Sequence, residues 1–341
     1  MALLSLRKIR LLGPVRIDSY RSFGSPNVVV FRGRVLAGPD LTVATKSEHV
    51  GHRLLRSATR LLSREIDDVQ VRLTVDGIDV LGITDDEGYY EIPLPITSTN
   101  RLVNGTVQVV GRPRAWPAVA HVIDPLTTRI IVSDVDDTLL VNGIGETIET
   151  IRQTITGSVL TREPVAGTPS LYRSLSEDGA VPFFYVSSSP WNLYEFLSDF
   201  MRINHIVPGP LMLRDFGIDE NKFIASSHGE HKLAQIRSVL SRYPDLPFIL
   251  SGDSGQDDPA IYATICKEFP GKILAVYIRD VGHAWKRDSV QRLITQLSDQ
   301  GIDMLLIPDT LAAATHAHAQ EFLTQDSLAD ITHALDVSSR F

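Results

Sequence analysis

The chain has 341 residues, of which 43% are hydrophobic and 22% are charged, a composition that excludes wholesale disorder and supplies apolar material for two domains. Its 33 basic and 41 acidic residues leave a net charge of -8, which argues against a general nucleic-acid-binding protein. The single cysteine, Cys266, excludes an internal disulfide framework and a cysteine-rich zinc site, and it fits a reducing compartment.

Membrane attachment has one candidate segment, at the N-terminus. No apolar run reaches the roughly 18 residues that a bilayer-spanning helix needs, so we expect a soluble, cytoplasmic protein. Residues Met1–Leu12 combine leucines with Arg7, Lys8 and Arg10, which suits either an amphipathic helix on a membrane surface or a segment packed on the first domain. Packing is the favoured interpretation, and peripheral membrane contact is the alternative.

Residues 1–124 are predicted to form a small β-rich, sandwich-like domain with one helix. Short β-branched runs are separated by turn residues such as Asp76-Gly77. Apolar residues at helical spacing predict the helix at residues 47–64. The expected strands are residues 27–36, 69–75, 77–84, 89–94, 105–110 and 117–122.

An acidic segment in this domain, DDEGYYEI at residues 85–92, has two interpretations. It could bind Ca²⁺, but it lacks the spaced ligands, the central glycine and the distal glutamate of a helix-loop-helix site. A plain hairpin turn is therefore the favoured interpretation. Because the domain contains no catalytic constellation, we expect it to bind or position a partner.

Residues 125–326 are predicted to form a doubly wound, mostly parallel, Rossmann-like α/β sheet with helices on both faces. The pair Asp124-Pro125 marks the junction, beyond which apolar runs alternate with longer helical stretches. The expected strands are residues 130–134, 182–187, 223–226, 247–253, 273–280 and 303–309, and the expected helices are residues 191–201, 232–241, 258–268 and 289–300. Residues 327–341 are predicted to form a C-terminal helical tail.

The stretch RIIVSDVDDTLL ends an apolar strand in Asp134, Asp136, Asp137 and Thr138. Parallel α/β sheets bind ligands just beyond the carboxyl ends of their strands. Carboxylates two residues apart that face one small space repel each other unless a cation is present. The pattern therefore predicts a hard metal ion, most simply Mg²⁺.

Three further segments place polar groups at the ends or starts of predicted elements. They are YVSSSPW with Ser187, SSHGEHK with Lys232, and SGDSGQDDP with Asp253, Asp257 and Asp258. Carboxylates, a hydroxyl and an ammonium group at one edge of a sheet are the groups that phosphoryl transfer requires.

In this order, the four segments resemble the four motifs of the haloacid dehalogenase superfamily of phosphatases. The strings SDVDDTLL, FFYVSSSPWNLYEFLSDF, VPGPLMLRD, FILSGDSGQDDPAIY and VYIRDV further resemble the catalytic domain of the actin-patch-associated, Mg²⁺-dependent phosphatidate phosphatases and their bacterial relatives. The strings GRVL and TDDEGYYEI are similar to the β-rich region that precedes that domain. The resemblance implies a phosphatase that converts phosphatidate to diacylglycerol.

The resemblance also implies roles for individual residues. Asp134 would attack phosphorus and form an aspartyl-phosphate, and Asp136 would protonate the leaving oxygen and then accept a proton from water. Mg²⁺ would be held by Asp134, Asp253, the Asp136 backbone carbonyl, waters and a phosphate oxygen. Asp257 and Asp258 compete for the remaining acidic position, and the sequence leaves that choice open.

Ser187 and Lys232 are expected to contact the transferring phosphoryl oxygens. A second group is expected to bind phosphate or to support the metal ligands: Thr138, Ser188, Ser189, Asn192, Ser254 and Arg279. His228 and His231 are three residues apart, but two histidines are too few for a metal site, so a role in shaping the loop before Lys232 is favoured.

The spacing of the motifs predicts an open site. Only about fifty residues separate Asp134 from Ser187, and the segment from Ser187 to Lys232 is similarly short, so no large cap domain fits. An open site suits a large or interface-bound phosphoester, and the apolar residues of segment 141–160 either face lipid or pack as a helix. The favoured function is a Mg²⁺-dependent phosphatidate phosphatase with a phospholipid substrate. The alternatives are a phosphatase for a phosphoprotein or another large phosphoester, and a non-catalytic binding or scaffold protein.

Overall fold

The computed structural model describes residues 13–38, 64–96, 100–124, 126–140, 163–214 and 228–338. The chain divides into two compact units, Met1–Leu126 and Thr127–Phe341. Several predicted segments lie outside the described residues: 1–12, the helix at 47–64 apart from Arg64, the apolar stretch 141–160 and the strand at 223–226. Among the described ranges, no helix is long and apolar enough to cross a membrane.

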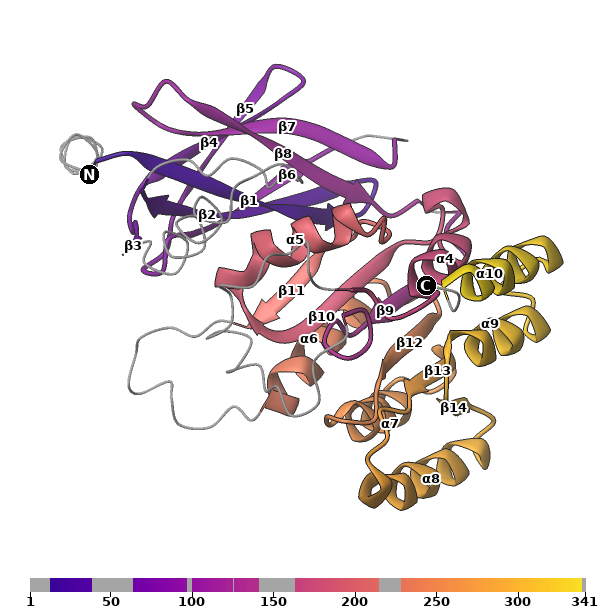
Figure 1. The fold of residues 1–341 in the computed structure, drawn as a ribbon. Coiled ribbons are helices and arrows are strands. Elements are labelled where there is room, and N and C mark those ends of the chain that lie inside the picture. The colour runs from indigo at the N-terminus through magenta and orange to yellow at the C-terminus, as the bar shows by residue number, and fades with distance from the viewer. Residues whose placement is uncertain are drawn as a thin grey trace. The chain divides into compact units, whose positions relative to one another are not determined.

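The N-terminal unit is built on one eight-stranded sheet in the part of the chain that the structure describes (Figure 1). The strands pair in the order β3-β2-β1-β8-β7-β4-β5, β6 also pairs with β2, and β1 and β8 run parallel. Their bounds are β1 Val15–Gly24, β2 Val28–Ala37, β3 Arg64–Glu65, β4 Gln70–Val75, β5 Ile78–Ile83, β6 Tyr89–Pro95, β7 Leu102–Val109 and β8 Ala115–Val122. The predicted strands of this unit are thus confirmed within a few residues.

The strands of this unit belong to a single barrel-like sheet around one core, where a sandwich-like arrangement was predicted. β1, which sequence reasoning missed, pairs with both β2 and β8 and so joins the two halves. Its polar residues hide it in the sequence: Arg16 is buried, and its Nε lies 3.0 Å from Asp18 Oδ1. Elsewhere in this sheet, a Cβ on Gly82 of β5 would lie 2.6 Å from the Ile92 side chain of β6. Glycine therefore permits the close approach of β5 to that side chain.

The acidic segment at residues 85–92 contains a tight turn, but it is not a hairpin. The Asp85 carboxylate accepts hydrogen bonds from the backbone N–H groups of Glu87 at 3.0 Å and Tyr89 at 2.8 Å. In the described sheet, however, β5 pairs with β4 whereas β6 pairs with β2. The hairpin prediction is wrong because the curl of the whole sheet, rather than the local turn, decides which strands pair.

His121 on β8 gives this unit a testable pH dependence. Burial and then the neighbouring Arg21, whose Nη1 lies 2.7 Å from His121 Nε2, lower the pKa of His121 from 6.5 to about 4. Since the unfolded state binds the proton more tightly, the stability contribution is intact above pH 6.5 and is lost as the pH falls towards 4. We expect this loss to reach about 3 kcal/mol.

Thermal unfolding of the whole chain at about pH 7 and about pH 4.5 measures this effect in the wild type and in His121→Gln. Gln keeps an acceptor for Arg21 but takes up no proton. The melting temperature of the variant should therefore fall less on acidification than that of the wild type. Equal falls would mean that His121 takes up its proton as readily in the folded chain as in the unfolded chain.

The second unit is built on a parallel six-stranded sheet within the described residues, in the order β11-β10-β9-β12-β13-β14 (Figure 1). The strand bounds are β9 Ile130–Ser133, β10 Phe183–Pro190, β11 Leu211–Arg214, β12 Phe248–Asp253, β13 Ile273–Arg279 and β14 Asp303–Ile307. The helices are α4 Thr168–Leu175, α5 Tyr194–Ile203, α6 His228–Arg242, α7 Asp258–Glu268, α8 Ala284–Ser298, α9 Thr310–Ala319 and α10 Gln325–Ser338, with short 3-10 turns at Glu177–Gly179 and Trp191–Leu193. The predicted alternation of strands and helices around a parallel sheet is confirmed.

Helices cover both faces of this sheet. Phe183 and Tyr185 of β10 belong to a core cluster that also holds side chains of α4, α5 and α9. The intervening Phe184 packs against Tyr243, just beyond α6, with ring centroids 6.0 Å apart. Because successive side chains of a strand point to opposite faces, α6 covers the other face. α10 joins the first cluster through the fully buried Ile331.

Sequence reasoning missed β11, α4 and α9 and extended β14 too far. β11 has only four residues, too few for a clear pattern. In α9, the buried residues Ala313, Ala314 and Ala317 are small and lie among other alanines, so no amphipathic stripe marks the helix. Asp309, assigned to the preceding strand, instead caps α9, because its carboxylate accepts a hydrogen bond from the Ala312 N–H at 2.8 Å.

Candidate active site

The carboxyl edge of the second sheet brings acidic residues from two neighbouring strands together. Asp134 directly follows β9, and Asp253 is the last residue of β12. These strands pair in parallel register, and the Asp134 N–H donates to the Ser251 carbonyl at 2.8 Å. Both carboxylates therefore leave the sheet at the same edge, where parallel α/β proteins bind ligands.

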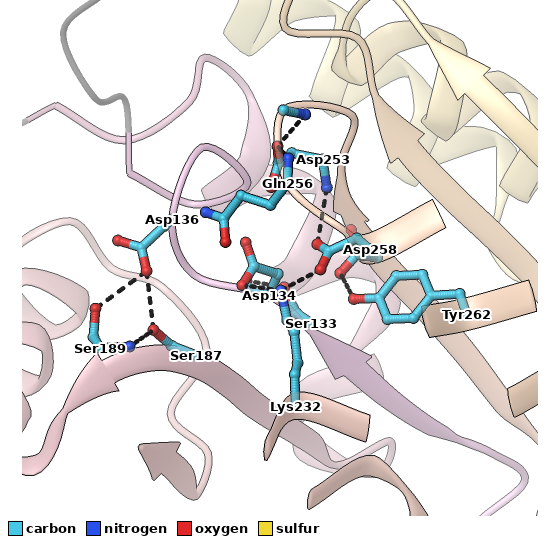
Figure 2. Close-up of polar contacts among 12 residues, drawn as sticks. Ser133, Asp134, Asp136, Ser187, Ser189, Lys232, Asp253, Gln256, Asp258 and Tyr262 are labelled. Carbon is cyan, nitrogen blue, oxygen red and sulfur yellow. Dashed lines mark hydrogen bonds and ion pairs between the residues drawn. The ribbon is translucent and has the colours of Figure 1, made fainter. Parts of the chain in front are cut away.

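Lys232 of α6 lies between two acids (Figure 2). Its Nζ donates to Asp134 Oδ1 at 2.7 Å and makes a short contact with Asp258 Oδ1. All three side chains are at most 2% exposed. Burial by itself lowers the pKa of Lys232, but the charges of Asp134 and Asp258 outweigh it and raise the pKa above its usual value. The ammonium group is therefore held in its charged form.

The structure separates the two acids that the sequence could not distinguish. Asp258, at the start of α7, is fully buried, and its Oδ2 accepts a hydrogen bond from the Asp253 N–H at 3.2 Å. Asp257 is exposed. Gly252 makes room for this arrangement, since a Cβ at that position would overlap the Asp258 carboxylate. Asp258 thus joins the acidic cluster and Asp257 does not.

Asp134, Asp253 and Asp258 form a buried cluster whose ligand atoms lie within 4.8 Å of one another. Asp134 Oδ2 and Asp253 Oδ2 are buried and have no hydrogen-bond partner in the part of the chain that the structure describes. Burial raises the pKa of Asp134 well above its usual value, although Lys232 opposes the shift. Burial, followed by the charge of Asp258, raises the pKa of Asp253 to about 7. Unused buried carboxylate oxygens fit a hard divalent cation, which would stabilise their charged form.

Asp136 is bound by serines of β10 rather than by Lys232 (Figure 2). Its Oδ2 accepts hydrogen bonds from Ser187 Oγ at 2.9 Å and Ser189 Oγ at 3.2 Å. Burial raises the pKa of Asp136, although the hydrogen bond from Ser187 opposes the shift. The contact of Ser187 with a phosphoryl oxygen stays a prediction, because its hydroxyl lies on Asp136 here.

Arg279 and Ser254 support the loops around the acids. Arg279 Nη1 donates to the Asp137 carbonyl at 2.7 Å, and Asp137 has a φ of 53°, in the sparsely populated left-handed region. Ser254 Oγ accepts a hydrogen bond from the Val281 N–H at 3.1 Å. Arg279 therefore holds a strained turn next to the acids through the backbone.

The remaining predicted residues are less informative. Thr138 is buried, and its hydroxyl has no hydrogen-bond partner among the described residues. Ser188 is buried on β10. The side chains of Asn192 and His228 lie outside the described set. The group of metal-ligating residues found in the described ranges contains no histidine, and His231 is not part of it.

Sequence reasoning missed two residues at this site, Gln256 and Lys286. The Gln256 N–H donates to Asp253 Oδ1 at 3.1 Å. Lys286 Nζ donates to the carbonyls of Gly255 at 2.7 Å and Gln256 at 2.9 Å. The string SGDSGQDDP could have indicated Gln256, because it lies between two acids of interest. No local signal marks Lys286, which reaches the loop from α8.

Buried acids, a lysine and hydroxyl groups at the carboxyl edge of a parallel α/β sheet are the kinds of groups that phosphoryl transfer uses. Residues 129–280 match the family model described as "Phosphatidate phosphatase APP1, catalytic domain". The chain is also 34% identical over 150 residues to "Phosphatidate phosphatase APP1" of Saccharomyces cerevisiae, a match that covers 44% of this chain and 25% of that protein. These findings support an enzyme of the phosphatase class.

A second relative comes from Schizosaccharomyces pombe, "Uncharacterized protein C29B5.04c", which is 31% identical over 154 residues, covering 44% of this chain and 25% of that protein. The chain thus spans about a quarter of the length of the curated relatives it matches. Among solved structures, it is similar to XAC1771, a carbohydrate acetylesterase from Xanthomonas citri, with a TM-score of 0.28, 12% identity, and coverage of 80% of this chain and 70% of that one.

Proposed function

We propose that this chain is a Mg²⁺-dependent phosphatidate phosphatase of the haloacid dehalogenase type, which hydrolyses phosphatidate to diacylglycerol and inorganic phosphate. The observation that carries the proposal is the buried contact of Lys232 with Asp134 and Asp258, next to carboxylate oxygens of Asp134 and Asp253 that lack a partner among the described residues. The match of residues 129–280 to a phosphatidate phosphatase catalytic domain supports the choice of substrate.

In the first proposed step, an oxygen of Asp134 attacks phosphorus while the bond from phosphorus to the glycerol oxygen breaks. Asp136 donates its proton to that leaving oxygen, which releases diacylglycerol. The raised pKa of Asp136 favours the protonated form that this step needs. Lys232 lowers the pKa of Asp134 against the effect of burial, which favours the ionised nucleophile.

In the second proposed step, water attacks phosphorus of the aspartyl-phosphate and gives its proton to Asp136. The bond from phosphorus to Asp134 breaks, so inorganic phosphate leaves and both acids return to their starting forms. Bound Mg²⁺, held by Asp134, Asp253, Asp258 and the Asp136 carbonyl, would offset the negative charge of the acids and the phosphoryl group. Lys232 keeps one ammonium hydrogen for a phosphoryl oxygen after its two carboxylate contacts.

The test is release of inorganic phosphate from phosphatidate in detergent micelles, compared with a phosphopeptide and a soluble sugar phosphate, each with Mg²⁺ and with EDTA. We expect phosphatidate to be the best substrate and EDTA to abolish its turnover, because the buried acids would lose the cation that offsets their charge. A preference for the phosphopeptide would mean that the substrate is a phosphoprotein rather than a lipid. Turnover that survives EDTA would contradict the metal, and no turnover of any ester would favour a non-catalytic binding protein.

The proposed substrate lies in a lipid surface, so the proposal includes a cytoplasmic location and peripheral contact with a membrane. Co-sedimentation with vesicles that contain phosphatidate measures this contact. Vesicles of neutral lipid alone are the control, and equal sedimentation with both would contradict recognition of phosphatidate.

A further inference from the structure

The phosphoryl group in the proposed reaction has oxygens that accept hydrogen bonds, and the described site has few uncommitted donors for them. Lys232 Nζ already donates to two carboxylates, which leaves it one N–H. The hydroxyls of Ser187 and Ser189 both donate to Asp136. Because charge on the phosphoryl oxygens must be stabilised during transfer, a further donor at this edge of the sheet would contribute directly to catalysis.

Gln256 provides such a donor. Figure 2 shows its carboxamide directed towards the side of the site where Asp134 and Asp136 lie. Its backbone N–H is 3.1 Å from Asp253 Oδ1, and the ligand atoms of Asp253 and Asp134 lie within 4.8 Å of each other. Within the described residues, the side-chain amide of Gln256 makes no hydrogen bond, so both of its N–H groups are uncommitted.

The backbone of Gln256 is held on both sides. Its N–H donates to Asp253, and its carbonyl accepts a hydrogen bond from Lys286 Nζ at 2.9 Å. The same ammonium group also holds the carbonyl of Gly255 at 2.7 Å. The loop between β12 and α7 is thus fixed by the acid at its start and by a cation from α8, and this fixes where the Gln256 side chain begins.

We propose that Gln256 is a further catalytic residue whose carboxamide N–H donates to an oxygen of the transferring phosphoryl group, and that Lys286 is a positioning residue that holds it there. This inference rests on the proposed phosphatase function. A neutral amide suits the position because it adds donors without adding charge. A carboxylate there would repel the phosphoryl group, and an ammonium group would pair with the buried acids.

Binding of inorganic phosphate to the full chain in excess Mg²⁺, measured by calorimetry, tests the contact without turnover. The variants are Gln256→Ala, which removes the donor, and Gln256→Glu, which also adds a charge. Gln291→Glu, at an exposed position of α8, is the matched control. We expect Gln256→Ala to weaken phosphate binding, Gln256→Glu to weaken it further, and the control to bind like the wild type.

Turnover of phosphatidate should fall by about a hundredfold in kcat/KM for Gln256→Ala, the usual effect of removing one donor to a developing anion. Melting temperatures should match that of the wild type, because the Gln256 amide makes no hydrogen bond with the described residues. Wild-type phosphate affinity in both Gln256 variants would overturn the proposal, and so would a wild type that binds no phosphate. If the wild type hydrolyses no phosphoester, the phosphatase function fails, but the phosphate-binding series still decides the contact.

The positioning role of Lys286 is tested by a double-mutant cycle. Lys286→Met should lower kcat in the wild-type background but cause little further loss in the Gln256→Ala background, because its effect passes through Gln256. Additive losses would overturn the positioning role.

Discussion

Replacing Asp134 with Asn should lower kcat for phosphate release by at least about a thousandfold. Asn has nearly the same shape as Asp, and its amide oxygen can still accept the hydrogen bond from Lys232 that now spans 2.7 Å. It cannot form the aspartyl-phosphate. Burial and the neighbouring acids raise the pKa of Asp134, so removing its charge should not destabilise the folded chain.

Steady-state turnover in Mg²⁺ and a thermal melt of the same preparation measure both halves of this prediction. The control is Asp245→Asn, an exposed carboxylate beyond α6, which should leave turnover and melting temperature unchanged. Near-normal turnover in Asp134→Asn would contradict its role as nucleophile. A large fall in melting temperature would instead contradict the view that its charge is costly in the folded state.

Replacing Lys232 with Met should have the largest effect on stability, about 3–5 kcal/mol, and should abolish turnover as well. Its ammonium group contacts both Asp134 Oδ1 and Asp258 Oδ1, and all three groups are buried. Without it, two buried carboxylates must either stay charged without that partner or take up protons. Either outcome opposes folding, and proton uptake by Asp134 also leaves the nucleophile less ionised.

Urea unfolding of the whole chain, with and without Mg²⁺, measures the stability that Lys232→Met loses. Arg237→Met is the matched control on the same helix, because Arg237 pairs with Glu268 at the exposed surface, where ion pairs contribute little. We expect Mg²⁺ to restore part of the stability of Lys232→Met, since the cation would offset the same acids. A variant as stable as the wild type would show that the two acids do not depend on Lys232.

Much of the candidate site was predictable, because its main residues stand at the ends of apolar runs. Asp134 and Asp253 each end a β-branched or apolar strand, and parallel strands share one carboxyl edge. Lys232 could be placed from its motif context, although its helix begins earlier, at His228. The hydrogen-bond partners of these side chains were harder to predict. Ser187, for example, was expected to contact a phosphoryl oxygen, and in the structure its hydroxyl donates to Asp136.

The fold, like the site, was predictable in part. Strands with a clear apolar pattern, such as β12 and β13, were predicted almost residue for residue. β1 was missed because buried Arg16 interrupts its pattern. The hairpin was predicted because β5 and β6 adjoin in sequence, although they pair with different strands. Strand pairing over long sequence separations depends on the whole sheet, which local periodicity does not report.

The sequence by itself determined that Asp134 and Asp253 lie at the carboxyl edge of the second sheet, because each stands where an apolar run ends. Only the tertiary structure decided between Asp257 and Asp258. The start of α7 and the missing side chain of Gly252 turn Asp258 inward and leave Asp257 exposed. Only the tertiary structure brought Lys286 to the Gln256 loop, because a side chain of one helix that reaches the backbone of a loop thirty residues away leaves no local pattern in the chain.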